Sequence, residues 1–107
     1  MANICDNRCY IYSKNTELLE VISDEILDKI DDYLDIWNSD ENYIECAFQS
    51  KWVFPMSEME TITNKLKEKY DLEDLSIRVI SEEFGCNYVA LNRFENQEWL
   101  DEQTFDF

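Results

Sequence analysis

Apolar and polar positions change their spacing several times along the 107-residue chain, and each spacing predicts an element. Between residues 16 and 37 apolar side chains recur every three or four positions, the period of a helix with one buried face. This face consists of Leu19, Ile22, Ile26, Ile30, Tyr33 and Trp37, with Leu27 and Leu34 beside it. Asn15 or Thr16 is suited to cap the first turn. We therefore predict one long helix over residues 16–37.

Four other segments are predicted to be strands: residues 8–13, 43–54, 75–80 and 87–94. They alternate apolar and polar positions or are rich in β-branched and aromatic residues. Gly85 lies between the last two segments and suits a hairpin turn that needs positive φ.

A second helix is predicted after Pro55, which interrupts the strand pattern. Ser57 and Glu60 have the spacing of a capping box. The apolar stripe that follows consists of Met59, Ile62, Leu66 and Tyr70.

The resulting order is strand, long helix, strand, helix, strand, strand. It predicts an α+β fold, a ferredoxin-like two-layer sandwich of about four antiparallel-rich strands with two helices on one face. It departs from a plain βαββαβ order because the last two strands pair as a hairpin. We expect one domain over residues 1–107, with residues 95–107 forming an acidic C-terminal tail on the surface, pinned by Trp99, Phe105 or Phe107.

Composition favours a folded globule, since 45% of the residues are hydrophobic. No apolar run approaches the ~20 residues that a membrane span needs, and residues 1–12 do not resemble a signal peptide. We expect a soluble, cytoplasmic protein that does not bind membranes.

Charge is the most unusual property of the chain, with 25 acids against 9 bases. Residues 16–37 contain eight carboxylates and one base, Lys29. On the predicted helix the acids Glu17, Glu20, Asp24, Asp28, Asp31 and Asp35 lie opposite the apolar face. The late acids are unfavourable at the negative end of the helix dipole, so local stability does not explain them. Such a surface repels nucleic acid and favours basic partners.

Catalytic and cofactor signatures are missing from the sequence. There is no histidine and no glycine-rich phosphate loop, so we expect no enzyme activity and no cofactor. Glu82 and Glu83 are interpreted as solvated acids at a hairpin. The four cysteines, Cys5, Cys9, Cys46 and Cys86, are expected to be reduced and mostly buried; a zinc site of four thiolates is the alternative.

Four short segments resemble the YubB ferredoxin-like domain family of small plasmid and phage proteins. They are MANICDN at the start, SKWVFP (residues 50–55), SEEFG (residues 81–85) and RFENQEW (residues 93–99). The resemblance implies a ferredoxin-like α/β sandwich and a mobile-element origin. It implies no established activity, so it assigns no functional residues.

The acidic helix face suggests a non-enzymatic inhibitor that mimics nucleic acid, as an anti-CRISPR protein does. Six acids from Glu17 to Asp35 would span about 27 Å at ~1.5 Å per residue and enter a basic nucleic-acid-binding groove of a host defence protein, of which a CRISPR effector is one example. The predicted partner-binding residues are Glu17, Glu20, Asp24, Asp28, Asp31, Asp32, Asp35, Asp40 and Glu41. Tail acids from Glu95 to Asp106 would add a second edge, and Trp99 is predicted to be an exposed anchor.

Two other functions stay open at this point. A structural or adaptor module would assemble through exposed aromatic residues or the sheet edge, without mimicry. A small metal-binding protein would use the cysteines or carboxylates. The sequence does not determine the oligomeric state.

Overall fold

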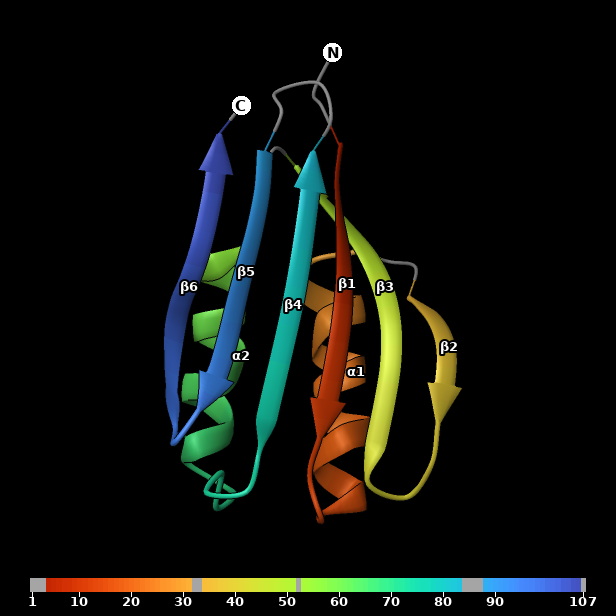
Figure 1. Cartoon of the computed structure of the whole chain (residues 1–107). Coiled ribbons are helices and arrows are strands. Elements are labelled where there is room, and N and C mark those ends of the chain that lie inside the picture. Colours follow the sequence, from red (N-terminus) through yellow and green to blue (C-terminus); the bar gives the residue numbers. More distant parts are fainter. Residues whose placement is uncertain (1–3, 32–33, 52, 84–87, 107) are drawn as a thin grey trace.

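The fold is an antiparallel sheet with two helices packed on one of its faces (Figure 1). The computed structural model describes residues 4–31, 34–51, 53–83 and 88–106, and for residues 101–106 it describes the backbone alone. Along the chain the elements are β1 (Ile4–Tyr12), α1 (Thr16–Lys29), β2 (Asp35–Ser39), β3 (Tyr43–Lys51), α2 (Met56–Lys67), β4 (Ser76–Glu83), β5 (Tyr88–Glu95) and β6 (Glu98–Asp106). The six-stranded sheet has the order β2-β3-β1-β4-β5-β6. The predicted α+β class is confirmed, but the strand count exceeds the predicted four.

The first helix is shorter than predicted, because α1 ends at Lys29 and the chain returns as strand β2. The backbone N–H groups of Ile30 and Asp31 both donate to the carbonyl of Ile26, which closes the last turn. Asp31 and Asp35 lie beyond the last residue of α1, and the Asp31 carboxylate accepts a hydrogen bond from the Gln49 backbone N–H. The prediction of one helix over residues 16–37 is therefore wrong in its last third.

The C-terminal segment is also a strand rather than a surface tail. β6 pairs antiparallel with β5 along its length. The two residues between them, Asn96 and Gln97, have φ of 51° and 65°, and positive φ at both central residues is typical of a tight type I′ hairpin turn. Asparagine tolerates this conformation well, whereas glutamine gives no such signal.

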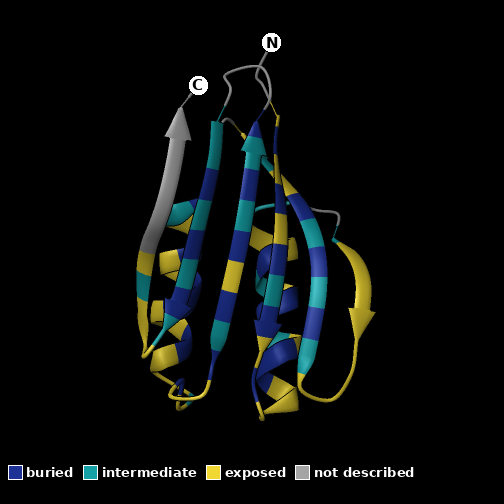
Figure 2. Ribbon diagram, viewed as in Figure 1, coloured by how far each residue is buried: buried dark blue, intermediate teal, exposed yellow. Residues whose placement is uncertain are grey.

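The core lies between the helices and the covered face of the sheet, where buried residues alternate with more exposed ones along β1, β3, β4 and β5 (Figure 2). α1 contributes Leu19, Ile22 and Ile26, as predicted, and also Leu18. α2 contributes Met59, Ile62 and Leu66, again as predicted. The period-3.6 and period-2 patterns therefore identified the buried faces even where an element boundary was wrong.

The two helices begin in different ways. The side chain of Asn15 accepts a hydrogen bond from the Leu18 backbone N–H at 3.4 Å, so the predicted cap of α1 is confirmed. α2 begins at Met56 after Pro55, and no side-chain hydrogen bond caps it. The predicted capping box is wrong because Ser57 already lies inside the helix. The predicted glycine turn at Gly85 lies outside the described residues, although the β4–β5 pairing itself is confirmed.

Truncating Phe94 to alanine should lower the free energy of unfolding by about 3–5 kcal/mol. The Phe94 ring is fully buried in the core and packs edge-on against Trp99 at 5.4 Å. Urea unfolding followed by tryptophan fluorescence measures the change. The matched control Val53→Ala, at an exposed position, should stay within about 0.5 kcal/mol of the wild type; equal losses would contradict the packing argument.

Candidate functional site

The outer face of α1 carries four exposed carboxylates in a row: Glu17, Glu20, Asp24 and Asp28. Successive residues of a helix are rotated by ~100° about its axis. At this rotation the four carboxylates lie on the side of α1 opposite its buried positions. From Glu17 to Asp28 the row spans eleven residues, or about 16 Å at ~1.5 Å each. We call these four residues the acidic row. It is shorter than the predicted ridge of about 27 Å, which assumed a helix continuing to Asp35.

The later predicted acids have other surroundings. Asp31 is half-buried, and its Oδ2 accepts a hydrogen bond from the Gln49 backbone N–H at 2.8 Å. Asp35 lies on β2, and its Oδ2 accepts from Trp37 Nε1 at 2.7 Å. Asp32 lies outside the described residues. Asp31 and Asp35 therefore hold local structure together and do not continue the acidic row.

Two loops bring further carboxylates to the beginning of α1. Asp40 and Glu41, predicted as partner-binding residues, are both exposed and follow β2. Thr16 Oγ1 donates to the Glu41 carbonyl at 2.9 Å, which fixes this loop against the helix start. The loop after α2 adds acids that sequence spacing did not connect with the helix: Asp71, Glu73 and Asp74, all exposed.

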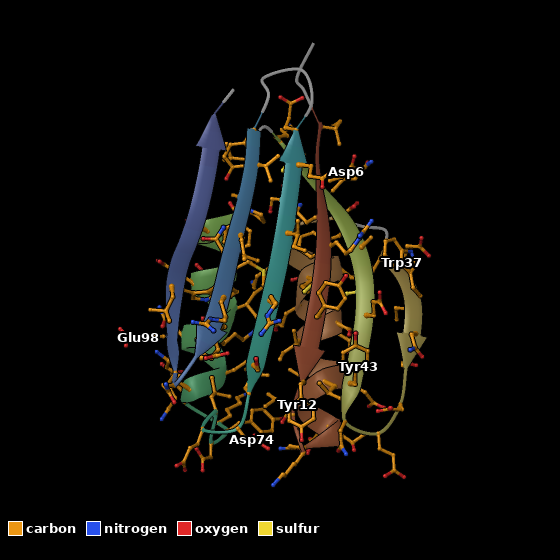
Figure 3. The ribbon with its side chains drawn as sticks, in the orientation of Figure 1. Asp6, Tyr12, Trp37, Tyr43, Asp74 and Glu98 are labelled. Carbon is orange, nitrogen blue, oxygen red and sulfur yellow. The ribbon has the colours of Figure 1, made fainter. Side chains whose placement is uncertain are left out.

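Hydrogen bonds fix the second of these loops in place. The Oδ atoms of Asp74 accept from Ser13 Oγ at 3.2 Å and from the Lys14 backbone N–H at 2.9 Å. Tyr70 Oη donates to Glu17 Oε1 at 3.3 Å. Asp74 accordingly lies at the same end of the molecule as Tyr12, near the beginning of α1 (Figure 3). We call Glu17, Asp40, Glu41, Asp71, Glu73 and Asp74 the acidic end.

The acidic end affects a neighbouring phenol. Loss of hydration, followed by the charge of Glu17, raises the pKa of Tyr70 above its usual value near 10. A negative charge disfavours the phenolate, so this pKa reports the local potential at the start of α1.

The predicted exposed anchor, Trp99, is instead a packing residue. Its ring is half-buried and lies against Phe54 at 5.6 Å and Phe94 at 5.4 Å. Its Nε1 donates to Thr63 Oγ1 at 3.1 Å. Trp99 therefore joins β6 to α2 and does not project into solvent.

Trp37, predicted for the core, is exposed. The register between β2 and β3 shifts between Ile36 and Asn38, leaving Trp37 without a partner in the ladder, which is the signature of a bulge that re-aims a side chain. The Arg8 guanidinium lies over the Trp37 ring, 5.2 Å from its centroid, and Figure 3 shows Trp37 on the edge strand β2. Ile36 and Trp37 are 50% and 47% exposed, so the edge strand β2 presents two large apolar side chains.

The sheet face away from the helices holds all three arginines of the chain, Arg8, Arg78 and Arg93. Arg78 is directly opposite Arg93, and Arg93 Nη1 lies 3.4 Å from Glu95 Oε1. Acids are interspersed on this face, including Glu45 beside Tyr10. Mixed charge of this kind contrasts with the acidic row, where one sign dominates.

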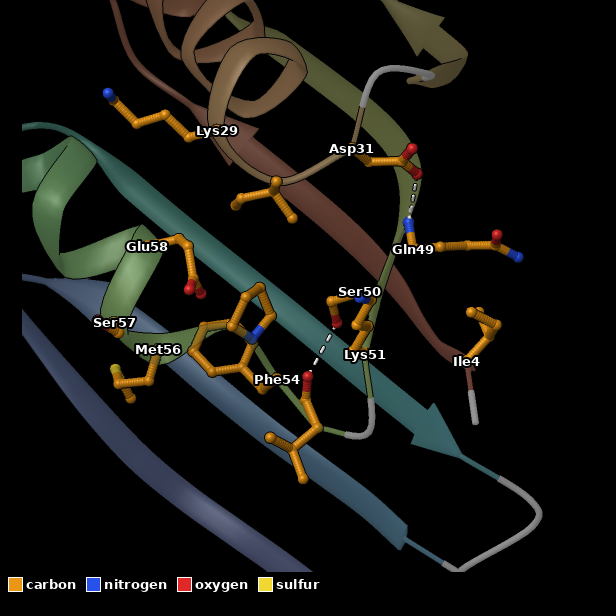
Figure 4. A pocket seen from close by; sticks show the side chains of 13 residues that line it. Ile4, Lys29, Asp31, Gln49, Ser50, Lys51, Phe54, Met56, Ser57 and Glu58 are labelled. Atoms are coloured by element: carbon orange, nitrogen blue, oxygen red, sulfur yellow. Dashed lines mark hydrogen bonds between the residues drawn. The ribbon is translucent and has the colours of Figure 1, made fainter. Parts of the chain in front are cut away.

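A groove of about 710 Å³ lies between the end of α1 and the beginning of α2 (Figure 4). Its apolar wall consists of Ile4, Ile30, Val53, Phe54, Pro55 and Met56. Lys29, Lys51, Asp31 and Glu58 also line it, so its charges balance. The groove is suited to an apolar side chain more than to an ion. Within the described part of the chain, no group of three or more cysteine, aspartate and glutamate side chains is arranged to hold a metal ion.

The four short segments MANICDN, SKWVFP, SEEFG and RFENQEW contribute residues that contact one another. Asn7, from the first segment, donates to Ser50 Oγ at 2.9 Å and accepts from Ser81 Oγ at 2.7 Å. Ser50 and Ser81 belong to the second and third segments. The fourth segment joins them through Phe94 and Trp99, because Trp99 packs on Phe54. Asn7 and Ser81 are buried, so this is an internal polar network.

Comparison of the chain with protein-family models, with curated proteins and with solved structures gives no match. Among the described residues, no helix is long and apolar enough to cross a membrane.

Neutralising Glu17 should lower the pKa of Tyr70 toward its ordinary value. The Glu17→Gln variant removes a charge that disfavours the phenolate, and NMR-detected titration of the tyrosine rings between pH 8 and about 12 measures the change. Folding raises the pKa of Tyr70. The contribution of this tyrosine to the free energy of unfolding is therefore fully present below pH ~10 and is lost as the pH rises through the raised pKa. Tyr43, whose pKa is raised by burial and Glu45, serves as the internal control and should not move. A Tyr70 titration identical in wild type and variant would contradict the contact.

Proposed function

We propose that this protein is a non-enzymatic inhibitor that binds a basic, nucleic-acid-binding surface of another protein. The observation that carries the proposal is the concentration of exposed carboxylates on the acidic row and the acidic end. The chain segments that form these surfaces contribute few bases, namely Lys14, Lys29 and Lys69. An ordinary solvated face would intersperse both signs to relieve repulsion.

The helix provides the spacing that such binding needs. Glu20, Asp24 and Asp28 are four residues apart and follow one another at about one helical pitch, ~5.4 Å. Their carboxylate oxygens accept charge-assisted hydrogen bonds from lysine and arginine side chains, as phosphate oxygens do. A cleft that binds nucleic acid presents lysine and arginine donors to the phosphates, and the carboxylates of the acidic row can accept hydrogen bonds from the same donors.

Preorganisation supports the same proposal. The loops of the acidic end are tied to the start of α1 by Asp74 and Thr16, and Asp40 Oδ1 accepts from the Asn42 backbone N–H at 2.9 Å within its own loop. Charges held by the fold lose little conformational entropy on binding. The long-range field of an acidic protein also accelerates encounter with a basic partner.

A mobile-element origin, with a host defence protein such as a CRISPR effector as the partner, is the specific form of this proposal. It rests on the resemblance to the YubB ferredoxin-like family. The first six elements, β1-α1-β2-β3-α2-β4, have the βαββαβ order of that fold, with β5 and β6 as additions.

Removing the acidic row should weaken partner binding by about 4- to 900-fold, since four exposed ion pairs at ~0.2–1 kcal/mol each sum to about 0.8–4 kcal/mol. The test variant is E17Q/E20Q/D24N/D28N. Its matched control, D6N/E45Q/E82Q/E95Q, removes four acids from the opposite sheet face and leaves the same net charge. Capture from a host lysate identifies the partner, and titration calorimetry with the purified partner measures affinity at low and high salt.

The proposal requires that the captured protein bind nucleic acid, and that nucleic acid compete with the wild-type chain. Binding should weaken at about 1 M salt, where the Debye length is ~3 Å. Equal behaviour of the two variants would mean that net charge, and not the acidic row, determines binding. Capture of no partner would leave the acidic face as a solubility device.

A structural adaptor is the alternative, and exposed Ile36 and Trp37 on the edge strand favour it. Apolar association of this kind should persist at high salt, and Trp37→Ser should reduce it. Analytical ultracentrifugation of the isolated chain at about 0.1 and 1 M salt distinguishes the two functions. A monomer under both conditions would contradict self-assembly through β2.

A further inference from the structure

Two cysteines face each other in the middle of the sheet. Cys9 on β1 is directly opposite Cys46 on β3 in the antiparallel register. Both side chains are fully buried on the helix-covered face and belong to the hydrophobic core. Both are free thiols.

Their placement meets the geometric requirement for a disulfide. Directly opposite residues of an antiparallel pair have Cα atoms ~4.5–5.5 Å apart, within the ~4.4–6.8 Å that disulfides span. The two thiols contact each other, since a hydrogen bond to Cys46, together with burial, raises the pKa of Cys9. Cys9 is therefore in its thiol form near neutral pH, and the register places the Cys46 thiol beside it.

The third described cysteine offers an internal comparison. Cys5 is also on β1 and fully buried, but its register partner on β3 is Ser50. Its Sγ is directed to Asn7 Oδ1 at 3.9 Å. Cross-strand pairing thus singles out Cys9 and Cys46.

We propose that Cys9 and Cys46 form a redox-sensitive clasp, which closes as a disulfide between β1 and β3 when the protein meets a hydroperoxide. One thiol loses its proton as its sulfur attacks an oxygen of hydrogen peroxide; the O–O bond breaks, a cysteine sulfenic acid forms, and the leaving hydroxide takes that proton to become water. The second thiol then attacks the sulfenic sulfur, forms the S–S bond and releases a second water. The two thiols lose two electrons, and the hydroperoxide gains them.

The clasp would restrain a defined part of the molecule. Residues 10–45, between the two cysteines, include all of α1 and β2. Closing the disulfide joins the ends of this segment covalently and lowers the entropy of the unfolded chain. It would hold α1 and β2 to the centre of the sheet without exposing a new surface. This inference is independent of the proposed inhibitory function.

Exposure of the wild-type chain to hydrogen peroxide, followed by blocking of free thiols in denaturant and peptide mapping by mass spectrometry, tests the clasp. We expect a crosslinked peptide pair joining Cys9 and Cys46 to be the main product. We also expect a rise in the thermal midpoint on the order of 10 °C. Dithiothreitol should reverse both changes. Cys46→Ser is the matched control, and it should give neither the crosslink nor the shift.

Other products would overturn the proposal. Recovery of Cys9 and Cys46 as separately blocked thiols after prolonged oxidation would show that the core excludes the reaction. A crosslink that joins either of them to Cys5 or Cys86, or between two chains, would assign the chemistry to another pair. Because the crosslink is mapped in the wild-type chain, the result stands even where the serine variant does not fold.

Discussion

Antiparallel pairing of β1 on both of its edges is the constraint on which the rest of the structure depends. β3 and β4 pair with β1 from the two sides, and β2, β5 and β6 extend the sheet outward from them. The backbone groups of β1 are satisfied only when both neighbours are in register, and a slip of one residue would place its buried cysteines and Ile11 in solvent. The covered face so formed is the surface on which α1 and α2 bury their apolar stripes.

This arrangement explains how a chain with so much negative charge can fold. The acidic row lies on the side of α1 away from the sheet, while Leu18, Leu19, Ile22 and Ile26 bury the other side. Glu25, closer to the helix interface, is the exception, and Lys65 of α2 lies 2.8 Å from its Oε1. Repulsion within the acidic row is therefore confined to solvated positions, where water and salt screen it. On the sheet, Glu83 is buried, so its interpretation as a solvated acid is wrong. The core contains no uncompensated cluster of acids among the described residues.

The two surfaces of the molecule differ because the helices cover only one of them. On the helix side, one sign of charge dominates at the acidic row and the acidic end. On the open sheet face, Arg8, Arg78 and Arg93 are mixed with acids and tyrosines. Partner recognition through the acidic surface would thus be directional, with the sheet face turned away. The internal network of Asn7, Ser50 and Ser81 joins β1 to both of its neighbours, and Trp99 joins the sheet to α2.

The sequence by itself determined the α+β class, the start and buried face of α1, and the pairing of β4 with β5, because hydrophobic period and turn residues are local signals. Tertiary structure decided the end of α1 at Lys29, since Asp31 accepts a hydrogen bond from Gln49 and the residues from Asp35 onward pair with β3, although their spacing also suits a helix. It also decided that residues 98–106 form β6, and that Trp37 is exposed while Trp99 is packed. The acidic end depends on hydrogen bonds between residues far apart in the chain, such as Ser13 with Asp74 and Tyr70 with Glu17. Long-range contacts of this kind leave no periodic trace in a single sequence.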